Sequence, residues 1–416
     1  MSIIKPYSPL NDPTDHFAMV ATTLDGLEPV LKEELIALGA GSIKELDRAV
    51  SFSGDIALMM KANLCLRTAI RVLIPWQTFE IRDADDLYFK ALPLAFEDLF
   101  GIDQTFAIHA SVQSDFYSHP HYASLKLKDA IADHFRAQFD RRPDVSPHNP
   151  DMQFHLFIRG TKVEVQIDSS GESLHKRGYR QGGGEAPLNE VLAAGMILLS
   201  GWKGQAPLYD AMCGSGTILS EALLIACDVY PQWSREEFTF MNWKNFPKKL
   251  FTEIVHELEK KAHEPEFKVY GYDIDRQQLK KAKENLEEFP FSDFVRLEVA
   301  DFFRLIPQLQ DGWLILNPPY GERLPLDEAR EFYDAIGTRL KHHWSGFDAW
   351  VLSGNLPALK VLGLKPNSKH TLHNGGLECR YQGYKLFKGT RIEFKYGDQK
   401  QADNDDIGGR ENQDEA

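Results

Sequence analysis

The stretch Leu208-Tyr209-Asp210-Ala211-Met212-Cys213-Gly214-Ser215-Gly216-Thr217 joins a short apolar run to the apolar segment 218–225. The two glycines at its centre permit backbone angles that other residues avoid, and they let a ligand lie against the main chain. The free N–H groups at the start of the following helix favour an anion, such as a carboxylate or a phosphate. The stretch therefore predicts a strand, a ligand-binding turn and a helix.

Further apolar runs alternate with helical patterns, which is typical of a mostly parallel, Rossmann-like α/β sheet. The expected strands cover 206–210, 268–273, 295–299, 312–316 and 349–353. Such sheets bind ligands at the carboxyl ends of their strands. Asp273 ends the second run and can bind ribose hydroxyls, while Asp301 follows the third and can accept a hydrogen of an adenine amino group. Because 57 residues separate Gly216 from Asp273, we interpret the aromatic and charged segment between them as an insertion.

Three cofactors fit a glycine turn of this kind: ATP, NAD and S-adenosylmethionine. A nucleoside triphosphate requires GxxxxGK[ST], which the chain lacks, and NAD favours three glycines with an acid ~20 residues later. The two-glycine turn with an acid at its start favours S-adenosylmethionine. Asp210 can face the ammonium of that ligand, while the N–H groups of the loop meet its carboxylate.

The most specific motif is Asn317-Pro318-Pro319-Tyr320, directly after the run 312–316. Two consecutive prolines fix the backbone direction and leave their carbonyls free. The Asn317 side-chain oxygen and the Pro318 carbonyl can accept both hydrogens of an exocyclic base amine, and the Tyr320 ring can stack on the base. An amine conjugated with a base ring is a poor nucleophile, so methyl transfer to it depends mostly on positioning, which supplies up to ~7 to 11 kcal/mol in well-oriented systems.

The N-terminal half reads as α+β. A strand at 17–23, a helix at 27–38, short strands within 43–52, a helix at 55–63 and a strand at 69–79 predict a βαββαβ, ferredoxin-like unit. A helix at 84–100, a strand at 105–112, a helix at 122–139 and a hairpin of 154–159 with 162–168 follow. The glycines at 182–184 mark a domain boundary before a helix that begins near Asn189.

Composition narrows the class of protein. The 416 residues are 43% hydrophobic and 26% charged, which predicts two or three folded domains. The four cysteines form no CxxC pair, so we expect neither a metal site nor disulfides. No apolar stretch reaches the ~18 residues of a membrane helix, and we expect a cytoplasmic protein. A formal charge of −14 argues against nonspecific coating of nucleic acid, but it permits local basic patches.

The chain resembles the NPPY-bearing, S-adenosylmethionine-dependent RNA methyltransferases of bacteria that carry an N-terminal THUMP domain. Besides the glycine turn and NPPYGERL, the matching stretches are SHPHYASLKLKDAI (118–131), LHKRGYR (174–180), EAPLNEVLAAGMI (185–197) and GGLECRYQGYKLF (375–387). The resemblance implies a seven-stranded methyltransferase sheet after a ferredoxin-like and THUMP module. The expected domains are 15–68 (ferredoxin-like), 69–170 (THUMP), 171–184 (linker), 185–397 (methyltransferase) and 398–416 (disordered acidic tail).

Within this family the chain is similar to the guanine-specific half of the bifunctional enzyme that methylates 23S ribosomal RNA at a guanine 2-amino group. Transfer RNA guanine methyltransferases share the domain pair, and NPPY also serves adenine 6-amino methylation, so these alternatives stay open. A rival from another class is a noncatalytic RNA-binding ribosome-assembly factor with a vestigial pocket, and a third is an NAD-dependent reductase.

The predicted site residues fall into three sets. The catalytic set is Asn317, Pro318, Pro319 and Tyr320. The cofactor-binding set is Asn189, Asp210, Cys213, Gly214, Ser215, Gly216, Thr217, Asp273, Ile274, Asp301, Phe302 and Asn317, in which Cys213 is expected to pack rather than to act as a nucleophile. The RNA-binding set is Lys126, Lys128, Arg141, Arg142, Lys176, Arg177, Arg180 and Arg323.

Overall fold

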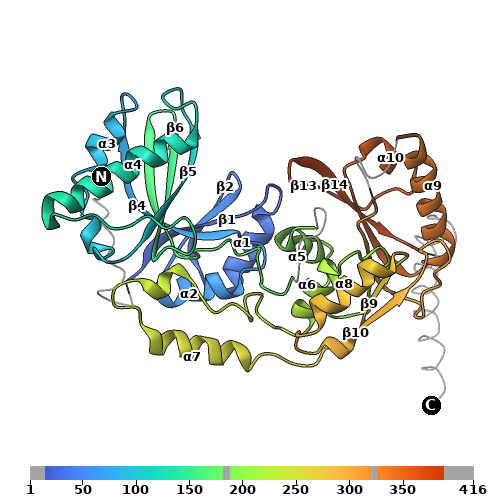
Figure 1. Cartoon of the computed structure of the whole chain (residues 1–416). Coiled ribbons are helices and arrows are strands. Elements are labelled where there is room, and N and C mark those ends of the chain that lie inside the picture. The colour runs from blue at the N-terminus through green and yellow to red at the C-terminus, as the bar shows by residue number, and fades with distance from the viewer. Residues whose placement is uncertain (1–14, 181–187, 320–325, 388–416) are drawn as a thin grey trace, which may run out of the picture. The chain divides into compact units, whose positions relative to one another are not determined.

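A computed structural model describes residues 15–180, 188–319 and 326–387 (Figure 1). The chain forms two compact units. The N-terminal unit comprises Met1–Leu199 together with Cys227–Glu264, and the C-terminal unit comprises Ser200–Ala226 together with Pro265–Ala416. The predicted linker glycines at 182–184, Tyr320, Arg323 and the predicted tail at 398–416 lie outside the described residues.

The N-terminal unit is built on one sheet with the strand order β2-β3-β1-β4-β7-β6-β5. Its elements are β1 (Phe17–Thr22), α1 (Glu28–Ala37), β2 (Gly41–Leu46), β3 (Ala49–Gly54), α2 (Ile56–Cys65), β4 (Arg71–Glu80), α3 (Asp86–Ala91), β5 (Phe106–Gln113), α4 (Pro120–Phe139), β6 (Met152–Arg159), β7 (Lys162–Asp168), α5 (Glu190–Leu199), η2 (Thr239–Asn242) and α7 (Lys248–Glu259). The α+β prediction for this half is therefore confirmed.

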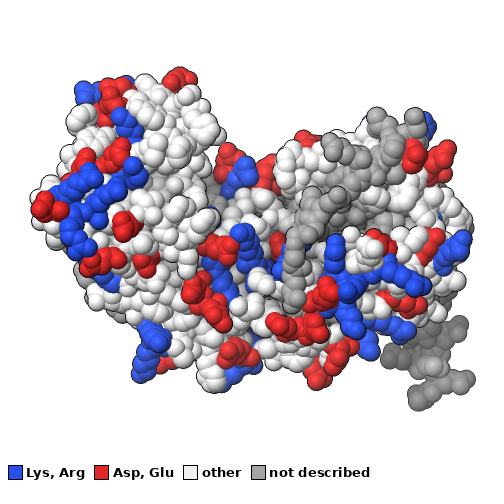
Figure 2. All heavy atoms as spheres, in the orientation of Figure 1, with Lys and Arg blue, Asp and Glu red and all other residues white. Residues whose placement is uncertain are grey.

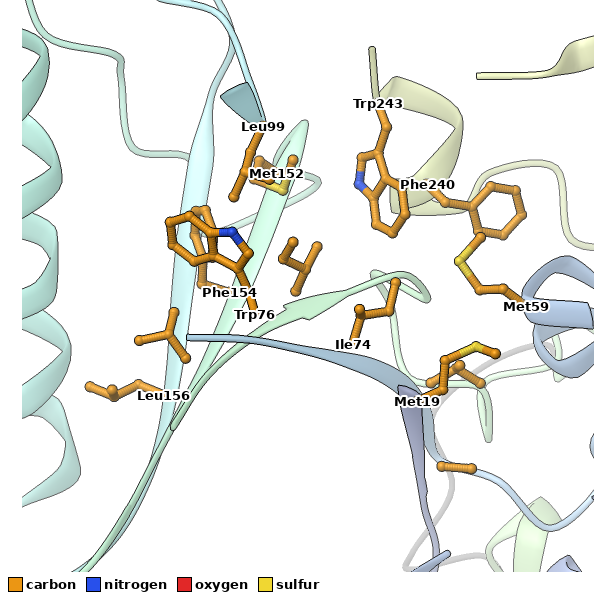
Figure 3. Close-up of a cluster of buried hydrophobic side chains, with 14 of the residues drawn as sticks. Met19, Met59, Ile74, Trp76, Leu99, Met152, Phe154, Leu156, Phe240 and Trp243 are labelled. Atoms are coloured by element: carbon orange, nitrogen blue, oxygen red, sulfur yellow. The ribbon is translucent and has the colours of Figure 1, made fainter. Parts of the chain in front are cut away.

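Strand β4 joins the two halves of this sheet, because it pairs with β1 on one side and with β7 on the other. The β4–β7 register shifts between Pro75 and Gln77. Such an irregularity accommodates a proline, which cannot donate a ladder hydrogen bond. One apolar core then runs under both halves, with Met19 and Ile74 on one side and Trp76 and Phe154 on the other (Figure 3).

The segment Cys227–Glu264, which interrupts the predicted catalytic domain in sequence, folds with the N-terminal unit. Phe240 and Trp243 from this segment join the same core as Ile74, as Figure 3 shows, and Ile254 and Leu258 of α7 do so too. Helix α5 also contacts this unit through α1. The sequence predicted an insertion here, but its packing partner depends on tertiary contacts that no local pattern encodes.

The C-terminal unit has the sheet order β10-β9-β8-β11-β12-β14-β13. Its elements are β8 (Leu208–Asp210), α6 (Thr217–Ala226), β9 (Val269–Asp273), α8 (Arg276–Leu286), β10 (Val295–Val299), β11 (Gly312–Leu316), α9 (Leu326–His343), β12 (Phe347–Ser353), α10 (Leu356–Val361), β13 (Ser368–Asn374) and β14 (Leu377–Lys385). The strands from β10 to β12 pair in parallel and β14 runs antiparallel to β12. This confirms the predicted Rossmann-like sheet of seven strands.

One predicted helix is wrong in extent. The sequence predicted a helix over 84–100, whereas the structure has α3 (Asp86–Ala91) and a separate 3-10 turn, η1 (Phe96–Asp98). Pro93 lies between them, and a proline disfavours helical angles in the residue before it and removes a donor. Among the described residues, no helix is both long and apolar enough to cross a membrane.

Candidate active site

The glycine turn connects β8 to α6 and lies against the end of β9. The N–H of Cys213 donates to the carbonyl of Tyr272 at 3.0 Å, and the N–H of Gly214 donates to Asp273 Oδ2 at 2.8 Å. Gly214 has φ +52° and Gly216 has φ +83°, so both adopt the left-handed region that favours glycine. A Cβ added to Gly214 would meet no atom within 4 Å, so the main chain there is open to a ligand.

The predicted acids lie at the same edge of the sheet. Asp273 is the last residue of β9, and its Oδ1 accepts the N–H of Asp275 at 2.9 Å. Each carboxylate oxygen has two lone pairs, so Asp273 retains acceptor capacity for ribose hydroxyls while it braces the turn. Asp301 follows β10, and its Oδ1 accepts the N–H of Phe303 at 2.9 Å. The glycine turn and Asp273 thus meet, although 57 residues separate Gly216 from Asp273.

Asp210, the last residue of β8, is only 1% exposed. Burial raises the pKa of its carboxyl, the N–H of Met212 opposes the shift and the charge of Asp273 adds to it, so that the pKa is about 8. A buried carboxyl next to a second acid is stabilised in its ionised form by a cation. The ammonium of S-adenosylmethionine is a cation of suitable chemistry, so this acid and the open glycine turn fit that cofactor.

The remaining predicted cofactor residues divide by exposure. Ile274 is 71% exposed beside Asp273, so its apolar side chain is accessible to a ligand. Phe302 is 3% exposed, and its ring packs on Trp344 with centroids 6.2 Å apart. Burial and the charges of Asp210 and Asp273 raise the pKa of the Cys213 thiol well above its usual value, which agrees with a packing role.

Three further predicted residues have visible main-chain or capping roles. Asn189 Oδ1 accepts the N–H groups of Val191 at 2.9 Å and Leu192 at 3.3 Å, so Asn189 caps α5. Thr217 begins α6 directly after the turn. The carbonyl of Ser215 accepts the side-chain amide of Asn285 at 3.0 Å. Sequence reasoning missed Asn285, because an asparagine on α8 carries no motif of its own.

Asn317 follows β11 directly, and β11 is the parallel neighbour of β8. Its Oδ1 atom is buried and has no hydrogen-bond partner among the described residues. Pro318 is buried and Pro319 is half-buried. A buried acceptor without a partner is costly, and a ligand that donates a hydrogen would remove the cost.

Acids accompany most of the predicted RNA-binding residues. Figure 2 shows Lys and Arg gathered near α4 with acidic side chains among them. The ion pairs are Lys126 with Asp85 at 2.6 Å, Lys128 with Asp129 at 2.8 Å, Arg141 with Asp103 at 2.9 Å and Lys176 with Glu172 at 2.6 Å. Arg142 is exposed. Exposed ion pairs are weak and can exchange for phosphate contacts, so these residues stay candidates.

Arg177 requires a correction, because it is 1% exposed. Its guanidinium donates to the carbonyls of Leu174 and Arg67, so it holds the main chain together rather than facing RNA. Arg180 is half-buried and pairs with Glu190 at 2.7 Å, where Glu190 is itself buried at the start of α5. A buried carboxylate needs a cation as a partner, which explains why the Arg180 side chain turns toward the protein interior.

Comparison with known proteins gives the family. Family models match residues 18–73 (RlmL ferredoxin-like domain), 82–168 (THUMP domain) and 177–383 (RMKL-like, methyltransferase domain). A protein of Synechocystis sp., provisionally named an RNA methyltransferase, is 34% identical over 88% of this chain and 96% of its own length. The chain belongs to the THUMP-domain RNA methyltransferases. The predicted family, and with it S-adenosylmethionine-dependent methyl transfer to RNA, is confirmed.

Solved structures agree with this family assignment. SMU.472, provisionally named a methyltransferase and crystallised with S-adenosylhomocysteine (SAH), is 29% identical with a TM-score of 0.81, over 90% of this chain and 99% of its own. A protein of Clostridium difficile 630, provisionally named a methylase, is 28% identical with a TM-score of 0.81, over 91% of this chain and all of its own. TrmN from Thermus thermophilus, at 19% identity and a TM-score of 0.64, shares the fold.

Proposed function

We propose that this THUMP-domain methyltransferase transfers a methyl group from S-adenosylmethionine to the exocyclic 2-amino group of a guanine in 23S ribosomal RNA. The observation that carries the proposal is the buried Oδ1 of Asn317, which has no hydrogen-bond partner among the residues that the structure describes. It follows the strand next to β8, whose last residue is the buried acid Asp210. An acceptor in this position suits the amine that receives the methyl group.

The proposed chemistry depends on positioning. When bound, S-adenosylmethionine supplies an electrophilic methyl group. Asn317 Oδ1 and the Pro318 carbonyl accept the two hydrogens of the base amine and direct its lone pair toward that methyl group. The amine sheds a proton once it becomes cationic, so no strong general base is required. The Asp210 carboxylate holds the ammonium of the cofactor, and Asp273 holds its ribose.

The choice of guanine and of 23S ribosomal RNA rests on the resemblance to the guanine-specific half of the bifunctional enzyme. The division of the chain into domains at 15–68, 69–170 and 185–397 belongs to the same proposal. Helix α5 and residues 227–264 lie within the predicted methyltransferase domain in sequence, but they pack in the N-terminal unit. The predicted methyltransferase domain therefore contributes to the fold of that unit.

The test is to incubate the protein with isotope-labelled S-adenosylmethionine and protein-free 23S ribosomal RNA or transfer RNA, and to identify the labelled nucleoside by mass analysis. We expect N2-methylguanosine in 23S ribosomal RNA. Label in N6-methyladenosine, or in transfer RNA alone, would contradict the proposed target. No label in any RNA, with no affinity for SAH by calorimetry, would favour a noncatalytic RNA-binding factor.

The Asn317→Ala variant tests the role of the acceptor. Because the variant cannot orient the amine, we expect turnover to fall at least about 100-fold, while the dissociation constant for SAH changes little. Asn367→Ala is the matched control, since Asn367 is exposed and its Oδ1 accepts the N–H of Lys385 at 3.1 Å. Wild-type turnover in Asn317→Ala would remove the proposed role of Asn317.

A further inference from the structure

Strand register places Tyr381 of β14 level with the end of β11. In the β12–β14 pairing, Leu352 lies opposite Tyr381, and in the β11–β12 pairing, Leu316 lies opposite Val351. Asn317 is the next residue after Leu316, so it is level with Leu352 and Tyr381. Two strand spacings of ~4.8 Å separate the two backbones, and side chains on one face of a sheet stand roughly perpendicular to it.

Alternation along the strands places the two side chains on one face of the sheet. Leu314 and Leu316 of β11 belong to the core cluster that includes Tyr333 and Ile336 of α9, so Asn317 continues the opposite face. On β14, Tyr384 belongs to that core cluster and Tyr381 does not. Asp210 also faces away from this cluster, because its neighbour Tyr209 is a member. The three polar groups therefore lie on one face near the carboxyl ends of the parallel strands.

The ring of Tyr381 is held firmly. It is 0% exposed and stacks on Trp350, with ring centroids 4.9 Å apart and planes at 30°. Gly383 makes room for this arrangement, since a Cβ added there would lie 2.7 Å from the Trp350 ring. A ring fixed in this way also fixes the position of its hydroxyl.

The hydroxyl itself is buried and has no hydrogen-bond partner among the described residues. Burial, and after it the charge of Asp210, raises the pKa of Tyr381 well above its usual value, so the phenol stays protonated. A protonated phenol without a partner can both donate and accept one hydrogen bond from a ligand.

We propose that Tyr381 is a binding residue for the target base, and that its hydroxyl contacts the ring edge beside the amine that Asn317 accepts. This inference rests on the proposed function. In guanine, the 2-amino group lies between N3, which accepts a hydrogen, and N1–H, which donates one. A tyrosine hydroxyl can donate to N3 or accept from N1–H. Either hydrogen bond prevents the base from rotating in the plane of its ring.

Tyr381→Phe tests the inference, because it removes the hydroxyl and keeps the packed ring. We expect kcat/KM for RNA to fall roughly 10-fold, the loss typical of one hydrogen bond in a dry site. The dissociation constant for SAH should stay the same by calorimetry. The melting temperature should stay level or rise, since the variant removes a buried polar atom that has no partner within the described part of the chain.

Tyr384→Phe is the matched control. Tyr384 lies three residues along β14 on the opposite face, and its hydroxyl donates to Gln382 Oε1 at 2.7 Å. We expect its kcat/KM to remain at the wild-type value.

Three results would overturn the inference. Wild-type kcat/KM in Tyr381→Phe would show that the hydroxyl contacts no substrate. A 10-fold weaker affinity for SAH with unchanged turnover at saturating cofactor would assign the hydroxyl to the cofactor instead. A wild-type protein that methylates no RNA would contradict the proposed function, and this inference with it, whatever the variants do.

Discussion

At the scale of single residues, Asp210 links the site to pH. Its native pKa of about 8 lies above the ordinary carboxyl value of 3.8. The native state therefore binds more protons than the unfolded state between these two values, and stability falls as the pH rises through this window. From pH 5 to pH 8 this one group should lower the free energy of unfolding by up to about 4 kcal/mol.

Asp210→Asn should remove this pH dependence, because the amide cannot ionise. Urea unfolding at pH 5 and pH 8 would measure it: we expect a smaller loss of stability in the variant than in the wild type. Asp293→Asn, at an exposed acid of the same unit, should lose as much as the wild type. Equal slopes for Asp210→Asn and wild type would mean that the carboxyl is ionised in the free protein.

At the scale of elements, a buried polar network connects α2, β4 and the chain after β7. Asn63 Nδ2 donates to Ser169 Oγ at 2.8 Å and Asn63 Oδ1 accepts from Ser170 Oγ at 2.7 Å. Ser169 Oγ in turn donates to the carbonyl of Val72, and Ser170 Oγ accepts the N–H of Val72. Each buried group is satisfied only while its neighbours stay in place, so the network joins the predicted ferredoxin-like and THUMP parts.

Asn63→Ala should lower the free energy of unfolding by about 2 to 3 kcal/mol, because it strips two serine hydroxyls of partners in a dry interior. Asn242→Ala provides the control, since that side chain is exposed at the end of η2, and its effect should stay within about 0.5 kcal/mol. Denaturant unfolding of both variants gives the comparison. A loss in Asn63→Ala no larger than in the control would show that the network does not join the two parts.

How far the sequence predicts these elements depends on how local their causes are. Strands β10 and β11 match the predicted 295–299 and 312–316, because β10 alternates apolar with charged residues and β11 is a short apolar run between Asp311 and Asn317. The meeting of the glycine turn with Asp273 follows from parallel strand order alone. The inward turn of Arg177 depends on which carbonyls become its neighbours, and the alignment of Tyr381 with the end of β11 depends on which strands pair. No local pattern encodes either of them.

At the scale of the whole molecule, the chain passes between its units three times, at Leu199/Ser200, Ala226/Cys227 and Glu264/Pro265. Helix α6 begins at the glycine turn and ends at Ala226, and the next residue already belongs to the N-terminal unit. The glycine turn is therefore one ten-residue helix away, along the chain, from a segment that completes the core of the N-terminal unit.

This interleaving predicts how a fragment behaves. Residues 15–199 alone lack the segment 227–264, whose buried members in that core are Phe238, Phe240, Trp243, Ile254 and Leu258. The apolar surface under them would face water, at a cost of roughly 1.5 to 3 kcal/mol for each large side chain no longer covered. We expect the fragment to bind a hydrophobic dye and to unfold without a cooperative transition, although it contains every strand of its sheet.

The matched comparison is the same fragment with residues 227–264 joined to its C-terminus through a flexible glycine-serine linker. Restoring the missing layer should abolish dye binding and return a cooperative urea transition, measured by tryptophan fluorescence. A fragment 15–199 that already unfolds cooperatively and binds no dye would show that the N-terminal unit needs no help from the catalytic sequence. In that case residues 227–264 would not be required for the N-terminal unit to fold. The stability of that unit would then not depend on the methyltransferase half of the chain.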